Sequence, residues 1–282
     1  MRLLRIGPVG LEKPAVLDGD GNPRDVSSIV GDFNSEFFAS GGVQLLASLD
    51  LGALPVLSKD LRVGAPIVRP GNLVAVGLNY ADHASETNMA IPSEPILFNK
   101  APNTVIGPFD DICFPRGGTK VDWEVELGIV IGTKCRYLES SQAALSCIAG
   151  FVAINDVSER AFQVERGGQW VKGKAFETSC PTGPWLVTPD DAGIPEHFDL
   201  WLDVNGVRRQ TGSTSKMIFD VGTLLHYISQ LMVLDPGDLV ITGTPPGVGM
   251  GMANPEWLKV GDVVTLGVTA LGEQRTLVVA AP

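Results

Sequence analysis

Two glutamates that alternate with apolar residues are the first side chains in this sequence that could carry out chemistry. Glu124 and Glu126 lie in the run 121–132, whose other members are mostly Val, Ile, Leu and Gly. Residues two apart on a strand share a face, so both carboxylates are expected to point the same way while Val125 and Leu127 enter a core. An isolated pair of this kind is commonly a solvated strand face. On so apolar a strand the pair also favours a bound cation, which would offset the repulsion between the two charges.

Asp156 offers a third carboxylate. The apolar segment 150–155 runs directly into it, so Asp156 is expected at a strand end, just before a helix. The simpler interpretation is that Asp156 or Ser158 caps that helix. Together with Glu124 and Glu126 it makes an all-oxygen set, which suits Mg²⁺, Mn²⁺ or Ca²⁺ better than Zn²⁺. Mg²⁺ is the ion that we expect.

One of the three histidines has a setting that suits acid-base chemistry. His83 and Glu86 follow an expected strand and are three residues apart, so they share a helical face. A glutamate beside an imidazole orients the ring and stabilises its protonated form, which favours a general base. His197, in a loop, and His226, in an amphipathic helix, are interpreted as structural.

Three basic residues gather in the segment 163–176 of an otherwise acidic chain: Arg166, Lys172 and Lys174. This segment is either a solvated loop or a source of positive charge for a substrate carboxylate or a developing oxyanion. A second loop, residues 241–251, is rich in Gly and Pro but lacks the Gly-Lys-Ser/Thr of a Walker motif. Its backbone amides and the Thr244 hydroxyl could hold a carboxylate.

Composition excludes several classes of partner. The chain has 282 residues and a formal charge of −11, and its isoelectric point is about 4.7; nucleic acids and anionic membranes both require a basic surface. The sequence shows no signal peptide and no apolar run of membrane-spanning length, so we expect a cytoplasmic protein. The four cysteines match neither a redox pair nor a zinc site and are expected to be reduced and structural. Residues 18–25 resemble a calcium loop faintly, and a hairpin turn explains them better.

The distribution of short β-branched runs predicts a β-rich α+β fold with a mixed or antiparallel sheet. We expect a small N-terminal domain over residues 1–65, with a hairpin of strands 3–6 and 15–17 turned at 18–22, and a catalytic domain over 66–282. Strands are expected at 73–77, 95–99, 121–132, 150–155, 198–204, 238–242, 262–268 and 274–279. Helices are expected at 81–89, 140–146, 158–163 and 217–230.

Five motifs, in this order along the chain, resemble the fumarylacetoacetate hydrolase family. They are Gly-Leu-Asn-Tyr-Ala-Asp-His-Ala-Ser-Glu86, Asp-Trp-Glu-Val-Glu-Leu-Gly-Ile-Val-Ile-Gly132, Ile-Asn-Asp-Val-Ser-Glu-Arg160, Lys-Gly-Lys-Ala-Phe176 and Thr-Gly-Thr-Pro-Pro-Gly-Val-Gly249. The resemblance runs from about residue 71 to the C-terminus. It implies a mixed β-roll catalytic domain, a small N-terminal α/β domain and a homodimer.

The resemblance also implies roles for individual residues. Mg²⁺ or Mn²⁺ would be held by Glu124, Glu126 and Asp156, and His83 with Glu86 would form a catalytic dyad on a lid segment. Lys174 matches a catalytic position at the pyruvoyl end of the substrate. The matching substrate contacts are Tyr80, Gln163, Gly243 and Thr244.

The function implied is hydrolysis of the C3–C4 bond of a 2,4-dioxo acid, giving pyruvate and a second acid. The overall similarity is to hydrolases of acylpyruvates and of 2,4-dioxo-3-deoxy sugar acids, such as 2,4-didehydro-3-deoxy-L-rhamnonate. Decarboxylation of an oxaloacetate-like diacid, isomerisation or hydration stay open as alternatives, and so does a module that only binds a metal or a small acid. Arg116, Arg166 and Met250 are candidates for reading the group beyond C4.

Overall fold

The central sheet contains the strands that were predicted to hold the site. A computed structural model describes residues 1–86 and 90–282. Its largest sheet has the order β3-β2-β1-β14-β11-β10-β17-β5-β6, with β4 paired to β1, and it is mixed because β17 and β5 run parallel. Its strands are β1 (Arg2–Ile6), β2 (Lys13–Leu17), β3 (Pro23–Asp25), β4 (Val63–Gly64), β5 (Leu73–Gly77), β6 (Ile96–Asn99), β10 (Val125–Ile131), β11 (Ile148–Asn155), β14 (Leu186–Val187) and β17 (Leu239–Ile241).

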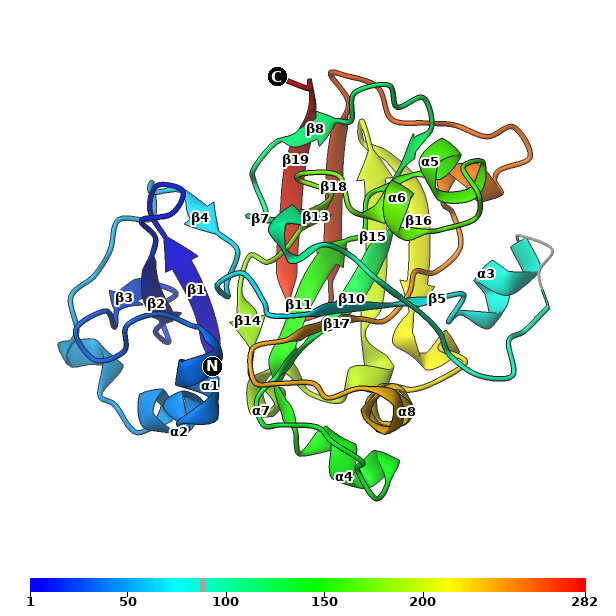
Figure 1. The fold of residues 1–282 in the computed structure, drawn as a ribbon. Helices are drawn as coiled ribbons and strands as arrows, with labels where there is room; N and C mark the ends of the chain where they lie inside the picture. The colour runs from blue at the N-terminus through cyan, green and yellow to red at the C-terminus, as the bar shows by residue number, and fades with distance from the viewer. Residues whose placement is uncertain (87–89) are drawn as a thin grey trace.

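A second sheet packs against one face of β10 and has the order β16-β15-β18-β19-β8. Val125 and Leu127 of β10 share a buried cluster with Leu202 and Leu266 of this sheet, whereas Val130 joins a different cluster. The predicted alternation of core residues along β10 is therefore confirmed, and Figure 1 shows the two sheets wrapped into one body. The strands are β8 (Ile112–Phe114), β15 (Asp199–Val204), β16 (Val207–Ser213), β18 (Val263–Val268) and β19 (Gly272–Ala280).

The N-terminal segment extends the central sheet on the left of Figure 1. The predicted hairpin of β1 and β2 is present, but the turn at 18–22 joins β2 to β3 instead. Asp18 accepts hydrogen bonds from the amides of Asp20 and Asn22, which accounts for this turn without a cation. Because β1 pairs with β14, the sheet is continuous across position 65, and the division at that residue stays a prediction.

The helices are short and cover the edges of the sheets. They are α1 (Ser35–Ala39), α2 (Gly42–Ala47), α3 (Ala81–Glu86), α4 (Ser141–Leu145), α5 (Arg160–Val164), α6 (Val171–Lys174), α7 (Pro189–Ala192) and α8 (Val221–Leu231). Of the predicted helix 81–89, residues 87–89 lie outside the described part of the chain. Within that part, no helix combines the length and the apolar character that crossing a membrane requires.

Three predicted elements differ from the structure. The predicted strand 121–132 is two strands, β9 (Val121–Asp122) and β10, because Trp123 and Glu124 between them are not in strand conformation. The helix predicted at 158–163 is preceded by β12 (Ser158–Glu159), and its cap is Glu159, which accepts from the amide of Phe162. The capping role considered for Asp156 and Ser158 is therefore wrong. The helix predicted from 217 begins at 221, where Asp220 caps it.

Two very short strands, β7 (Val105–Ile106) and β13 (Cys180–Pro181), pair in parallel. None of the four cysteines forms a disulfide, and Cys135, Cys147 and Cys180 are buried. The β-rich α+β class predicted from the sequence is confirmed by the two sheets and the short helices.

Candidate metal and substrate site

Three buried carboxylates converge at one end of β10 and β11. Val125 pairs with Asn155 across the two strands, so Asp156 directly follows the pairing and its amide donates to the Glu124 carbonyl at 2.9 Å. Glu124, Glu126 and Asp156 each offer an oxygen within 4.8 Å of the others. The strand register therefore assembles the set that the sequence had proposed from separate motifs.

Three buried cations surround this triad, and two of them contact Asp156. The Lys174 ammonium lies 2.6 Å from Oε2 of Glu124 and 2.6 Å from Oδ2 of Asp156. Lys100 lies 2.7 Å from Oδ1 of Asp156. This contact is an ion pair, and Oδ1 receives no hydrogen bond from the described residues. One lone pair of Asp156 is therefore left for a further ligand.

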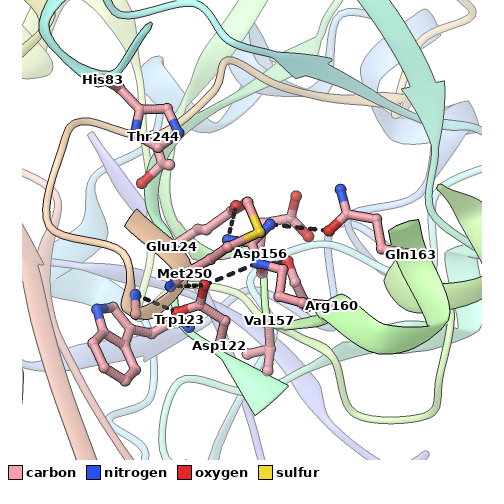
Figure 2. Close-up of polar contacts among 12 residues, drawn as sticks. His83, Asp122, Trp123, Glu124, Asp156, Val157, Arg160, Gln163, Thr244 and Met250 are labelled. Atoms are coloured by element: carbon pink, nitrogen blue, oxygen red, sulfur yellow. Dashed lines mark hydrogen bonds and ion pairs between the residues drawn. The ribbon is translucent and has the colours of Figure 1, made fainter. Parts of the chain in front are cut away.

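Arg160, the third cation, links the triad to the Gly/Pro loop. Its Nη2 donates to Glu124 at 2.6 Å, its Nε to Asp122 at 2.8 Å and its Nη1 to Gln163 at 3.0 Å. Asp122 also accepts from the amides of Gly249 and Met250, at 2.7 and 3.1 Å. Figure 2 shows Arg160 between Asp122 and Gln163. A movement of the loop would therefore shift Asp122 and Arg160, and through Arg160 it would affect Glu124.

The surroundings separate the pKa values of the two glutamates. Burial opposes ionisation of Glu124, but Lys174 and Arg160 outweigh it and lower its pKa to about 2. Burial raises the pKa of Glu126 well above its ordinary value, and the charges of Asp156 and Glu124 raise it further. Among the described residues, Glu126 accepts a hydrogen bond from the amide of Gly243 at 2.8 Å. Glu126 is thus the carboxylate whose charge the protein compensates least.

These features fit a divalent cation. The donors are hard oxygens in close reach of one another, one of them receives no hydrogen bond from the described residues, and the pKa of one carboxylate, Glu126, is raised because burial and the neighbouring carboxylates outweigh the charge of Lys174. A bound Mg²⁺ or Mn²⁺ would relieve that imbalance. Glu124, Glu126 and Asp156 are the residues that would hold it.

His83 and Glu86 form the predicted pair on α3. Nδ1 of His83 lies 3.0 Å from Oε2 of Glu86, and the other carboxylate oxygen of Glu86 accepts from the amide of Gly247 at 2.9 Å. The Gly/Pro loop thus fixes Glu86, and Glu86 in turn fixes the orientation of the imidazole. The arrangement is that of a base oriented by a carboxylate.

A cavity of about 270 Å³ is lined by His83 of the dyad and by Glu124 and Glu126 of the triad. Eight of the site residues proposed from the sequence line this cavity, namely His83, Glu124, Glu126, Gln163, Lys174, Gly243, Thr244 and Met250. Thr244 is held in place, because it accepts from Gln210 at 2.8 Å and donates to the Val125 carbonyl at 2.9 Å. Tyr80 is fully buried without lining the cavity, so its contact with substrate stays a prediction.

Arg116 and Arg166 lie outside the cavity. Arg116 donates to the carbonyl of Pro282 at 2.7 Å, and Arg166 stacks on the ring of Phe162 at 3.9 Å. The site also contains residues that the sequence analysis did not single out, namely Lys100, Asp122, Phe98, Arg160 and Trp170. The i, i+3 spacing of Arg160 and Gln163 was a usable signal for one of them.

A larger surface hollow, of about 770 Å³, lies elsewhere and contains none of these groups. Its Asp238 carboxylate accepts from the amides of Asn72 and Asp235, both at 2.8 Å. These bonds hold a turn together, so the smaller cavity is the better candidate for chemistry.

Similarity to known proteins shows the family of the chain. Residues 72–279 match the family described as Fumarylacetoacetate (FAA) hydrolase C-terminal. The chain belongs to the fumarylacetoacetate hydrolase family. A Burkholderia multivorans protein named "Putative hydrolase" is 50% identical over 282 residues, which is 100% of both chains.

Three solved structures of similar proteins show how varied the members of this family are. A fumarylacetoacetate hydrolase from Exiguobacterium antarcticum is 37% identical, with a TM-score of 0.89 and 99% of each chain covered. A Mycobacterium abscessus protein titled a probable 2-hydroxyhepta-2,4-diene-1,7-dioate isomerase is 32% identical, with a TM-score of 0.84 over 100% of both chains. The maleylpyruvate hydrolase of Sphingobium sp. SYK-6, in complex with manganese(II) and pyruvate, is 25% identical, with a TM-score of 0.82 over 100% of both chains.

Proposed function

We propose that this member of the fumarylacetoacetate hydrolase family is a Mg²⁺- or Mn²⁺-dependent hydrolase of a 2,4-dioxo acid. It would cleave the C3–C4 bond of an acylpyruvate or a 2,4-dioxo-3-deoxy sugar acid and release pyruvate and a second acid. The observation that carries the proposal is that one cavity is lined by His83 and by two glutamates of the acidic triad. A base and a site for a Lewis acid on opposite sides of one small substrate suit this cleavage.

Glu124, Glu126 and Asp156 would hold the cation. When bound, it would supply Lewis-acid stabilisation of negative charge at the 2-oxo end of the substrate. The ammonium of Lys174, which contacts Glu124 and Asp156, would add positive charge to the same end. The structure of the similar maleylpyruvate hydrolase, in complex with manganese(II) and pyruvate, supports a metal-dependent reaction on a pyruvate-like acid.

The dyad would activate water. With Nδ1 of His83 held by Glu86, we assign proton transfer to Nε2, which takes a proton from water as the oxygen attacks C4. The C3–C4 bond then breaks and its electron pair goes to C3, so C4 becomes the carboxyl carbon of the second acid. Protonation of C3 from the imidazolium gives the methyl group of pyruvate and restores His83.

An isomerase or a decarboxylase is the second candidate. The resemblance to a protein titled a dioate isomerase favours the first of these, and both reactions would use the triad without an attacking water. A module that binds a metal or a small acid without turnover would leave the His83–Glu86 pair without a role.

Pyruvate release in a coupled assay tests the proposal. The substrates are acetylpyruvate, oxaloacetate and a 2,4-dioxo-3-deoxy sugar acid, each with Mg²⁺ and with EDTA. We expect release from a dioxo acid that EDTA abolishes. Release from oxaloacetate alone would assign a decarboxylase, and no release from any substrate would reject the hydrolase. Light scattering on the same preparation tests the homodimer that we also propose.

A further inference from the structure

The lining of the cavity combines charged and polar side chains with an apolar wall. Its charged and polar side chains are Glu124, Glu126, Arg160, Lys174, His83, Gln163 and Thr244, and the apolar wall is formed by Val76, Leu78, Phe98, Val164, Trp170 and Met250. Phe98 and Trp170 meet edge to face with their ring centroids 5.4 Å apart. Trp170 packs so closely on Gly77 that an added Cβ would come within 2.6 Å of its ring. Trp170 is therefore held in place between Phe98 and Gly77.

The two cations that line the cavity, Arg160 and Lys174, are already engaged by other side chains of the protein. All three guanidinium nitrogens of Arg160 donate to Asp122, Glu124 or Gln163, and Lys174 contacts two carboxylates. Among the described residues that line the cavity, these two are the only Lys or Arg side chains. Lys174 lies over the Phe98 ring, 5.2 Å from its centroid, but it is already paired with Glu124 and Asp156. A second negative group on the substrate would therefore find no unengaged Lys or Arg among these lining residues.

The buried charges point to the same conclusion. Four carboxylates, Asp122, Glu124, Glu126 and Asp156, lie with three cations, Lys100, Arg160 and Lys174, so the cluster sums to −4 + 3 = −1 when every group is ionised. A divalent cation would change this to +1. One substrate carboxylate would then neutralise the site, and a second would add a negative charge with no unengaged Lys or Arg among the described lining residues to pair with it.

We propose that the site selects 2-oxo monoacids with an apolar group beyond C4 and discriminates against dicarboxylic and polyhydroxylated analogues. This rests on the proposed function, which places the 2-oxo acid end of the substrate at the triad. Hydroxyl groups in contact with the apolar wall are disfavoured for a related reason, because aliphatic and phenyl side chains offer them no hydrogen-bond partner. Phe98, Val164 and Trp170 are the residues that set this preference.

Binding of three six-carbon 2-oxo acids tests the proposal independently of turnover. The probes are 2-oxohexanoate, 2-oxoadipate and 2-dehydro-3-deoxygluconate, which share the 2-oxo acid end and differ only at C4, C5 and C6. Their binding is measured by calorimetry with saturating Mg²⁺. We expect 2-oxohexanoate to bind about tenfold more tightly than either of the others. Equal or tighter binding of the diacid or of the hydroxylated acid, or no binding of 2-oxohexanoate, would overturn the proposal.

A charge placed in the wall provides a second test. Val164 lines the cavity at the end of α5 and is 47% exposed, so substitution there should leave the fold intact. Val164→Lys should tighten 2-oxoadipate binding about tenfold relative to 2-oxohexanoate, whereas the uncharged Val164→Gln should not. The same change in both variants would contradict the selection by charge. Absence of pyruvate release with this binding order intact would reject the hydrolase while leaving the specificity in place.

Discussion

The carboxylate of Asp122 and the guanidinium of Arg160 form an ion pair in which Oδ2 accepts from Nε at 2.8 Å, with both side chains buried. Through this pair the Gly/Pro loop is connected to Glu124, because Asp122 also accepts from the loop amides. Neither residue stands out in the sequence, yet the pair holds one ligand of the candidate metal site in place.

The Asp122→Asn variant should be destabilised because it leaves Arg160 with one buried carboxylate partner fewer. We expect the free energy of unfolding to fall by about 3 kcal/mol, the lower end for a broken buried ion pair. Urea denaturation measures it. The matched control is Asp203→Asn, which breaks an exposed pair with Arg208 and should cost less than about 1 kcal/mol. Similar losses in both variants would contradict the structural role of Asp122.

The Glu126→Gln variant should separate metal binding from folding. Mg²⁺ should raise the melting temperature of the native protein but not that of the variant. In EDTA the variant should be as stable as the native protein or more so, because the substitution removes a buried charge that Asp156 and Glu124 repel. Thermal denaturation with Mg²⁺ and with EDTA gives both results, and Glu273→Gln, at an exposed position, is the control. A variant that still responds to Mg²⁺ would remove Glu126 from the ligand set.

The two glutamates should give the metal-free protein opposite pH dependences. The pKa of Glu124 is lowered from 4.5 to about 2, so its contribution to stability is present above pH 4.5 and is lost as the pH falls toward 2. The pKa of Glu126 is raised above 4.5, so the folded state binds its proton more tightly and stability is lost as the pH rises above 4.5. Subtracting the Glu126→Gln stability from the native value at each pH, in EDTA, isolates the second effect. We expect a difference that falls with rising pH, and a flat difference would show that Glu126 is not perturbed.

The His83→Asn and Glu86→Gln variants should lose hydrolysis while retaining the cation. A general base contributes about 10²- to 10⁴-fold to rate, so we expect His83→Asn to lower kcat by at least about 100-fold. Mg²⁺ affinity, measured by calorimetry, should stay close to the native value in both variants. His197→Asn, at an exposed position outside the cavity, serves as the control. Loss of metal binding together with activity would show that the dyad stabilises the metal ligands and would contradict its role in activating water.

The Gly77→Ala variant should perturb the substrate wall. The new Cβ would meet the Trp170 ring at 2.6 Å, whereas at Gly19 nothing lies within 4 Å of the same position. We expect KM to rise by about tenfold in Gly77→Ala, since the displaced indole changes the cavity, and no change in Gly19→Ala. Steady-state kinetics on acetylpyruvate measures both. An unchanged KM in Gly77→Ala would mean that the position of the Trp170 ring does not affect substrate binding.

Much of the fold was predictable where the pattern is local. Strand 73–77 has the predicted bounds, and the alternation from Val125 to Ile131 assigned the core face correctly. The residues at which strands and helices begin or end were harder to predict. Glu124 lies between two strands although its neighbours favour one continuous strand, because its backbone amide donates to the side-chain oxygen Oδ1 of Asn155 rather than to a backbone carbonyl of β11. Helix α8 begins four residues later than its apolar pattern suggests, because Asp220 caps it.

By itself, the sequence determined the side chains capable of chemistry: three carboxylates, a His–Glu pair on one helical turn and a Gly/Pro loop, each carried by a short motif. Only the tertiary structure decided how these charges are balanced. Lys100, Arg160 and Lys174 reach the triad from separate elements, so no local spacing reveals which carboxylate each one neutralises. The same is true of the apolar wall, where Phe98 and Trp170 meet through folding alone. Burial then turns these long-range contacts into large differences in pKa and in substrate preference, because charge interactions are strong where water is excluded.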